Sequence, residues 1–202
     1  SWGIDAITLG NHAFHKREIG PYLESESRIV RPSNMPPGTA GRGATRVQKN
    51  GVTLLVANIC GRVYMDHYGD PFREADRLLS EYPDAHVFID FHAEATSEKI
   101  AFAWYVDGRA TAVVGTHTHV QTADERILPC GLATISDVGM CGPIDSVLGM
   151  DREIILRRFL TAMPERFEVA NTPGVISGVV IGVEKESGRA LSIERIRYGE
   201  GF

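Results

Sequence analysis

The chain has 202 residues, of which 43% are hydrophobic and 23% are charged, and its formal net charge is −5. This length and composition are typical of one folded domain with a sizeable core, and they exclude a largely disordered chain. The acidic balance argues against a broad basic face that grips a nucleic-acid backbone. A small phosphate substrate remains compatible with it, because a bound metal can supply positive charge.

The first part of the chain predicts short elements separated by turns. Residues 4–9 predict a buried strand, and residues 15–23 have the composition of a helix. The Pro- and Gly-rich residues 31–43 must form a loop. Residues 44–59 predict a β-hairpin, because two strand-like runs flank the turn pair Asn50-Gly51.

Beyond the hairpin, helices alternate with short apolar runs. The sequence predicts a helix over 70–82, a strand over 85–91, a helix over 94–105, strands over 111–116 and 133–135, a helix over 151–162, and antiparallel strands over 167–170, 175–183 and 190–196. This order predicts a layered α/β fold in a single domain over residues 1–202. Because the apolar runs are continuous, we expect the central sheet to be covered on both faces.

Three of the predicted strands end in residues that can bind a metal. Asn11 and His12 follow the first strand, His92 ends "VFIDFH", and His117 and His119 end "AVVGTHTH". Ligands gather at the carboxyl ends of strands in open α/β sheets, and side chains two apart in an extended chain point the same way. A single histidine at a strand end is more often a hydrogen-bonded loop residue than a ligand. Together they predict a metal site, and imidazole with amide or carboxylate oxygen suits Zn, Mn or Fe.

The other candidate residues carry weaker signals. His15, His67 and His86 lack this strand-end context, so we interpret them as structural or solvated. Glu94 could orient His92 or another ligand, or it could be a carboxylate favoured by a helix N-terminus. Roles in substrate contact stay open for two residues of the Pro/Gly loop, Arg31 and Asn34.

The cysteines and apolar segments indicate the cellular environment. Cys60, Cys130 and Cys141 are too few and too widely spaced for a disulfide framework or a zinc knuckle, and we expect them to be small buried side chains in a reducing compartment. We find no signal peptide and no stretch long and apolar enough to span a membrane. The sequence therefore predicts a cytoplasmic protein.

Several stretches resemble one branch of a known family. "DAITLGNHAFHKREI", "RPSNMPPGTAGRG" and the long block from "FHAEATSEK" to "GTHTHVQTAD" are similar to the YmdB-like branch of the calcineurin-type metallophosphoesterases. The resemblance runs from Gly3 to near the C-terminus. It implies a four-layer α/β sandwich that holds two divalent or trivalent metal ions, with Mn or Fe favoured over Zn.

The resemblance also implies an activity and a role for each strand-end residue. The activity is metal-dependent hydrolysis of phosphodiesters, with 2′,3′-cyclic nucleotides as the associated substrates and a metal-activated hydroxide attacking phosphorus. By the motif, Asn11, His92 and His117 would bind one metal and His119 the other. His12 would act beside the leaving-group oxygen. The implied partner is a small phosphodiester, with no stable binding to a nucleic-acid duplex or a membrane, and a homo-oligomer is left open.

The chain departs from the family pattern at its start. The family carries an Asp after a first strand and a Glu-Asn pair after a second strand, and this chain begins after both. We therefore expect an N-terminally truncated fold with an open sheet edge or an exposed apolar face. One alternative is a truncated, inactive domain that is a binding or regulatory module or a mere fragment. Another is a different metal-dependent hydrolase, such as an amidohydrolase, which the late position of the His-x-His pair disfavours.

Overall fold

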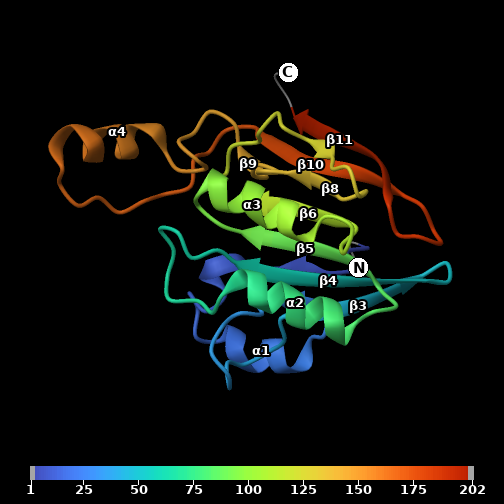
Figure 1. The fold of residues 1–202 in the computed structure, drawn as a ribbon. Helices are drawn as coiled ribbons and strands as arrows, with labels where there is room; N and C mark the ends of the chain where they lie inside the picture. The colour runs from blue at the N-terminus through green and yellow to red at the C-terminus, as the bar shows by residue number, and fades with distance from the viewer. Residues whose placement is uncertain (1–2, 200–202) are drawn as a thin grey trace.

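A six-stranded sheet in the order β3-β4-β5-β6-β8-β7 forms the centre of the computed structural model, which describes residues 3–199 (Figure 1). The strands are β3 (Ala44–Lys49), β4 (Val52–Cys60), β5 (His86–His92), β6 (Ala112–Thr116), β8 (Ala133–Ile135) and β7 (Arg126–Ile127). The four middle strands are parallel, and β3 and β7 are antiparallel edges. The parallel strands therefore bring their carboxyl ends to one edge.

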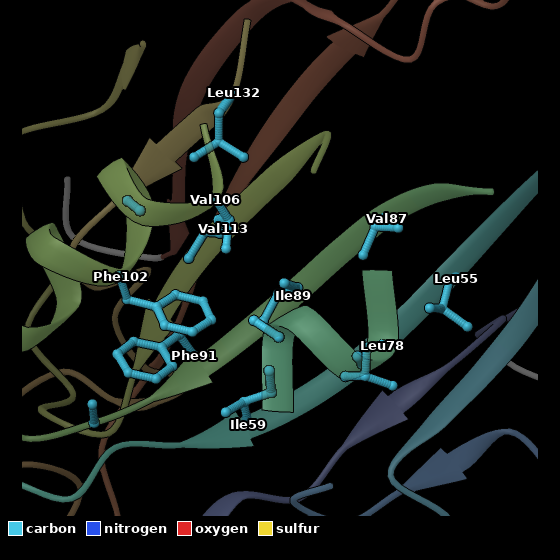
Figure 2. Packing of buried hydrophobic residues seen from close by; sticks show 14 of the residues in the cluster. Leu55, Ile59, Leu78, Val87, Ile89, Phe91, Phe102, Val106, Val113 and Leu132 are labelled. Atoms are coloured by element: carbon cyan, nitrogen blue, oxygen red, sulfur yellow. The ribbon is translucent and has the colours of Figure 1, made fainter. Parts of the chain in front are cut away.

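Two helices cover one face of this sheet, α2 (Pro71–Glu81) and α3 (Thr96–Val106). The start of α2 follows from its sequence, because Asp70 accepts hydrogen bonds from the backbone N–H of Phe72 and Arg73, and Pro71 needs no donor there. Figure 2 shows the core between the helices and the sheet, where Phe91 of β5 stacks on Phe102 of α3 with ring centroids 4.1 Å apart. Since side chains alternate along β5, Asp90 and His92 face away from this core.

A second sheet faces the other side of the central one. It consists of β11 (Ala190–Gly199), β10 (Gly174–Val183) and β9 (Gly142–Pro143). Ala112 and Ala133 of the central sheet pack with Ala190 of β11, and all three are buried. The two sheets and the helices thus form a layered sandwich, as the sequence predicts.

The coverage of the central sheet is incomplete where β3, β4 and β5 meet. An apolar hollow of about 760 Å³ lies there, and its walls include Val47, Leu54, Val56, Phe88 and Val183. The expectation that both faces are covered is therefore wrong for this part of the sheet. Val56 is buried in this hollow, and Val47, Leu54 and Phe88 are half-buried, so the hollow is an apolar recess and not a fully exposed face.

The N-terminal part differs in detail from its prediction. The strand is only β1 (Ile7–Thr8), which pairs in parallel with β2 (Ile29–Val30), and a 3-10 turn η1 (Gly10–His12) follows it. The helix α1 (Ile19–Ser25) begins four residues later than predicted. Before it, backbone N–H groups bond to the carbonyl three residues back, as Ile19 does to Lys16, so the chain turns rather than forming an α-helix.

The segment after β9 forms an outlying helix. α4 (Arg152–Thr161) is capped by the side chain of Asp151 and lies apart from the sheets (Figure 1). Its outer side chains include Phe159 and Leu160, which are 78% and 84% exposed. The predicted strand over 167–170 is wrong, because Val169 makes only one isolated bridge, to Met150.

Candidate metal centre

Three of the sequence-predicted ligands converge at the carboxyl edge of the central sheet. Asn11 comes from η1, His92 ends β5, and His117 follows β6. The Oδ1 atom of Asn11 lies 2.8 Å from Nε2 of His92, and Nδ1 of His117 lies 3.2 Å from the same Nε2. Adjacent donors around a cation with bonds of about 2.1 Å are about 3.0 Å apart when they subtend a right angle. The three atoms are therefore spaced like neighbouring ligands of one ion.

A half-buried threonine, Thr116, sets the tautomer of His92. The hydroxyl of Thr116 donates to Oδ1 of Asp90 over 2.6 Å, and its oxygen lies 2.8 Å from Nδ1 of His92. Because the hydroxyl has one proton and uses it on Asp90, its oxygen can only accept from His92. The proton of His92 is then on Nδ1, and the lone pair of Nε2 points at Asn11 and His117.

Glu94 has the same effect on His117. Its Oε2 atom lies 2.9 Å from Nε2 of His117, so this nitrogen carries the proton and the Nδ1 lone pair faces His92. The lone pairs of Asn11 Oδ1, His92 Nε2 and His117 Nδ1 then meet with no proton between them. A cation bound at this point would satisfy all three, and N and O donors of this kind bind transition metals. Within residues 3–199 no three side chains drawn from His, Cys, Asp and Glu could hold a metal. The set that fits a metal therefore depends on the amide of Asn11.

The electrostatics keep both imidazoles neutral. Burial lowers the pKa of His92 to about 3. The positive charge of Lys99, and that of His117 when it is protonated, act in the same direction. Burial also lowers the pKa of His117, although the charge of Glu94 opposes this shift. Neutral imidazoles bind metals, so these lone pairs are available at neutral pH.

The glycine of "GNH" allows Asn11 to reach His92. The backbone N–H of Gly10 donates to Oδ1 of Asn58 over 3.1 Å, and Nδ2 of Asn58 donates to the carbonyl of Asp90, so the turn is fixed to β4 and β5. Gly10 has φ = 69°. A Cβ at this position would lie 2.5 Å from Cε1 of His92. Only glycine fits both the backbone angle and the close contact.

The His-x-His loop is fixed by a buried ion pair. Oδ2 of Asp137 accepts from Nζ of Lys99 over 2.8 Å, from the backbone N–H of Thr118 over 3.0 Å and from its hydroxyl over 2.8 Å. The backbone at His117 and His119 has φ = 104° and 68°, which is not extended. The argument that side chains two apart point the same way therefore does not apply to this pair. His117 faces His92, whereas Nδ1 of His119 lies 3.4 Å from the carbonyl of Leu148.

The remaining predicted residues lie outside the converging set. His12 is exposed, and its ring meets the edge of His15 with centroids 5.7 Å apart. His86 contacts the carbonyl of Lys185. Arg31 donates to four carbonyls of its own loop, and Asn34 bonds to Cys60 and Gly69, so both residues stabilise the loop backbone.

Sequence reasoning missed the supporting residues Asn58, Asp90, Thr116, Lys99 and Asp137. One signal was present, since Asp90 precedes His92 by two residues in "FIDFH" and must share its face of β5. The burial of Cys60 is as predicted, and it raises the pKa of this thiol to about 12. Cys130 and Cys141 are exposed, so the prediction of buried side chains is wrong for them.

The chain belongs to the family of YmdB-like proteins, whose model matches residues 1–196. This confirms the resemblance seen in the sequence. The chain is 55% identical over 196 residues to the "2',3'-cyclic-nucleotide 2'-phosphodiesterase" of Bacillus subtilis (strain 168), covering 96% of this chain and 74% of that protein.

Solved structures agree with the fold. The crystal structure of a hypothetical protein from Thermus thermophilus matches with a TM-score of 0.93 and 45% identity, over 98% of this chain and 77% of that one. A putative 5'-nucleotidase from Staphylococcus aureus matches with a TM-score of 0.53 and 15% identity, over 94% of this chain and 37% of that one. The second likeness shows the fold alone, which is a layered α/β sandwich.

Proposed function

We propose that this chain is a metal-dependent phosphodiesterase that hydrolyses 2′,3′-cyclic nucleotides. The observation that carries the proposal is the convergence of Asn11, His92 and His117, whose lone pairs are directed by Thr116 and Glu94 toward one point. The name of the Bacillus subtilis relative supports this choice of substrate. It also favours a phosphodiester over the amide substrates of other metal-dependent hydrolases.

The chain's own residues would bind the metals and donate a proton to the leaving group. Asn11, His92 and His117 would bind one ion and His119 a second, with Mn or Fe favoured for both. When bound, such ions would neutralise phosphate charge and lower the pKa of a coordinated water. The exposed imidazole of His12 would protonate the leaving sugar oxygen, a role typically worth about 10²–10⁴-fold in rate.

The setting of the protein follows from its surface and cysteines. No helix within residues 3–199 is long and apolar enough to cross a membrane. We propose a cytoplasmic location, because Cys60, Cys130 and Cys141 are all free thiols. We propose a small phosphodiester as the partner rather than a duplex, since the net charge is −5.

The test combines a metal count with hydrolysis assays. We would purify the protein with Mn²⁺ or Fe²⁺, measure bound metal by elemental analysis, and assay adenosine 2′,3′-cyclic phosphate with and without a chelator. The variant His117→Ala should lose metal and activity. The control His86→Ala should keep both, because the ring of His86 contacts the carbonyl of Lys185 and none of the candidate ligands. Hydrolysis that is unchanged in His117→Ala or under chelation would contradict the proposal. Cleavage of amides but not phosphodiesters would indicate another class of hydrolase.

A further inference from the structure

A second feature lies directly beside the candidate metal centre. A cleft of about 480 Å³ begins at His119 and extends between the loop over residues 140–149 and the strands β10 and β11. We call it the His119 cleft, and its walls include His119, Met140, Ile144, Leu148, Ser177 and Arg195. Its volume is within the range of small-molecule sites, about 300–1,000 Å³.

The walls of the His119 cleft have two kinds of chemistry. Met140, Ile144 and Leu148 provide an apolar side. Arg195 and Ser177 provide hydrogen-bond donors on the other side, from neighbouring strands. The guanidinium of Arg195 is oriented by Glu125, whose Oε1 atom lies 2.8 Å from its Nε. An oriented guanidinium both stacks on flat rings and donates to acceptor atoms at their edges.

The cleft is held in a fixed position relative to the metal centre. Nε2 of Gln121, two residues after His119, donates to the carbonyls of Gly178 over 3.0 Å and Ile196 over 3.2 Å. These bonds fix the end of the His-x-His loop to β10 and β11. On the opposite wall, the turn that presents Leu148 is closed by the hydroxyl of Ser146, which accepts from the backbone N–H of Gly149 over 2.9 Å.

We propose that the His119 cleft binds the nucleoside part of the substrate, with the base between the apolar wall and Arg195. The inference rests on the proposed function. In a 2′,3′-cyclic nucleotide the phosphate is closed onto the ribose itself, so the nucleoside must lie immediately beside the phosphate. The proposed function gives His119 a metal-binding role, so His119 would border both the phosphate site and the cleft. The flat faces of a base match the apolar wall, and the hydrogen-bond acceptors on its edges match the donors of Ser177 and Arg195.

The first test measures binding without catalysis. We would determine the affinity of the protein for adenosine 3′-monophosphate by equilibrium dialysis, with inorganic phosphate as a second probe. Leu148→Ala removes part of the apolar wall, and Arg195→Gln removes the guanidinium while keeping a donor for Glu125. The matched control is Leu156→Ala on α4, because Leu148 and Leu156 are 48% and 54% exposed. Both cleft variants should bind the nucleotide at least fivefold more weakly, while the control and all phosphate affinities stay within twofold.

The second test separates this proposal from the proposed activity. The substrates are adenosine 2′,3′-cyclic phosphate and glycerol 1,2-cyclic phosphate, which has the same phosphate ring but no base. Both cleft variants should raise KM for the nucleotide and leave kcat/KM for the glycerol ester unchanged. Equal nucleotide affinity in all variants, or equal effects on the two substrates, would overturn the cleft proposal. If the parent protein cleaves neither substrate but binds the nucleotide through Leu148 and Arg195, the activity is wrong and the cleft proposal stands.

Discussion

The buried ion pair between Lys99 and Asp137 allows a quantitative prediction. The two side chains are only 4% and 2% exposed, and Asp137 also accepts from Thr118 and from the backbone N–H of Gly139. Asp137→Leu leaves the ammonium of Lys99 buried without its partner, which costs about 3–5 kcal/mol of unfolding free energy. With a urea m-value of about 2 kcal/mol per molar, the midpoint should fall by about 1.5–2.5 M. Urea titration followed by circular dichroism measures this shift.

Three controls test the reasoning behind this number. Lys99→Met should cost less than Asp137→Leu, because Asp137 keeps its bonds from Thr118 and Gly139. The double variant should be more stable than Asp137→Leu alone, because it removes the unpaired charge. Asp76→Leu breaks the exposed pair with Arg109 and should cost less than about 1 kcal/mol. A midpoint for Asp137→Leu equal to that of Asp76→Leu would refute the argument.

Three further predictions concern the donors at the candidate metal centre. Gly10→Ala should weaken metal binding at least tenfold, because the new Cβ would displace His92. Gly38 has a similar φ of 86° with no atom within 4 Å of a Cβ, so Gly38→Ala should leave the metal affinity unchanged. Equal metal affinities of the two variants would contradict this prediction. Thr116→Val should weaken metal binding about 10–100-fold by releasing the tautomer of His92, and Thr116→Ser should restore it; a valine variant with full affinity would remove the role of the hydroxyl. In the third prediction, acidification should destabilise the metal-free protein, because the pKa of His92 is about 3 in the folded protein and about 6.5 in the unfolded chain. Below pH 6.5 only the unfolded chain gains this proton, so the unfolding free energy falls by about 1.4 kcal/mol per pH unit until pH 3. Urea midpoints at pH 7 and pH 5 should show a shallower loss in His92→Asn, and parallel losses would show that other groups dominate.

Local sequence signals predicted the longer elements well, because their causes are local. The turn pair Asn50-Gly51 specifies the β3–β4 hairpin, and Asp70 with Pro71 specifies the start of α2. Strands of two residues such as β2, β7 and β9 have no periodicity to detect, and they exist because a neighbouring strand pairs with them. The helix predicted from residue 15 begins at Ile19 because short turns after η1 satisfy the backbone first.

The candidate ligands could be predicted from the sequence, but the residues that hold them in place could not. Asn11, His92 and His117 were identified because each follows a strand and carries a metal-binding atom. The link from Asp137 to Thr118 joins segments 19 residues apart, and the link from Asp137 to Lys99 joins segments 38 residues apart. No local pattern reports such contacts. The positive φ of His117 and His119 is not visible in the sequence either, and the extended-chain argument does not hold at these two residues.

The register of the central sheet has a consequence for folding. His92 lies opposite Thr116, and Asn58 lies opposite Asp90, on strands that are neighbours in the sheet but distant in the sequence. Because side chains alternate between faces, a slip of one residue between β5 and β6 would place Thr116 against the wrong partner. It would also turn the face that carries the candidate metal ligands of one strand into the core. A misregistered sheet could therefore keep its helices and its compactness while being unable to bind metal. Metal uptake during refolding would report the moment when the strands reach their native alignment, which circular dichroism alone does not distinguish.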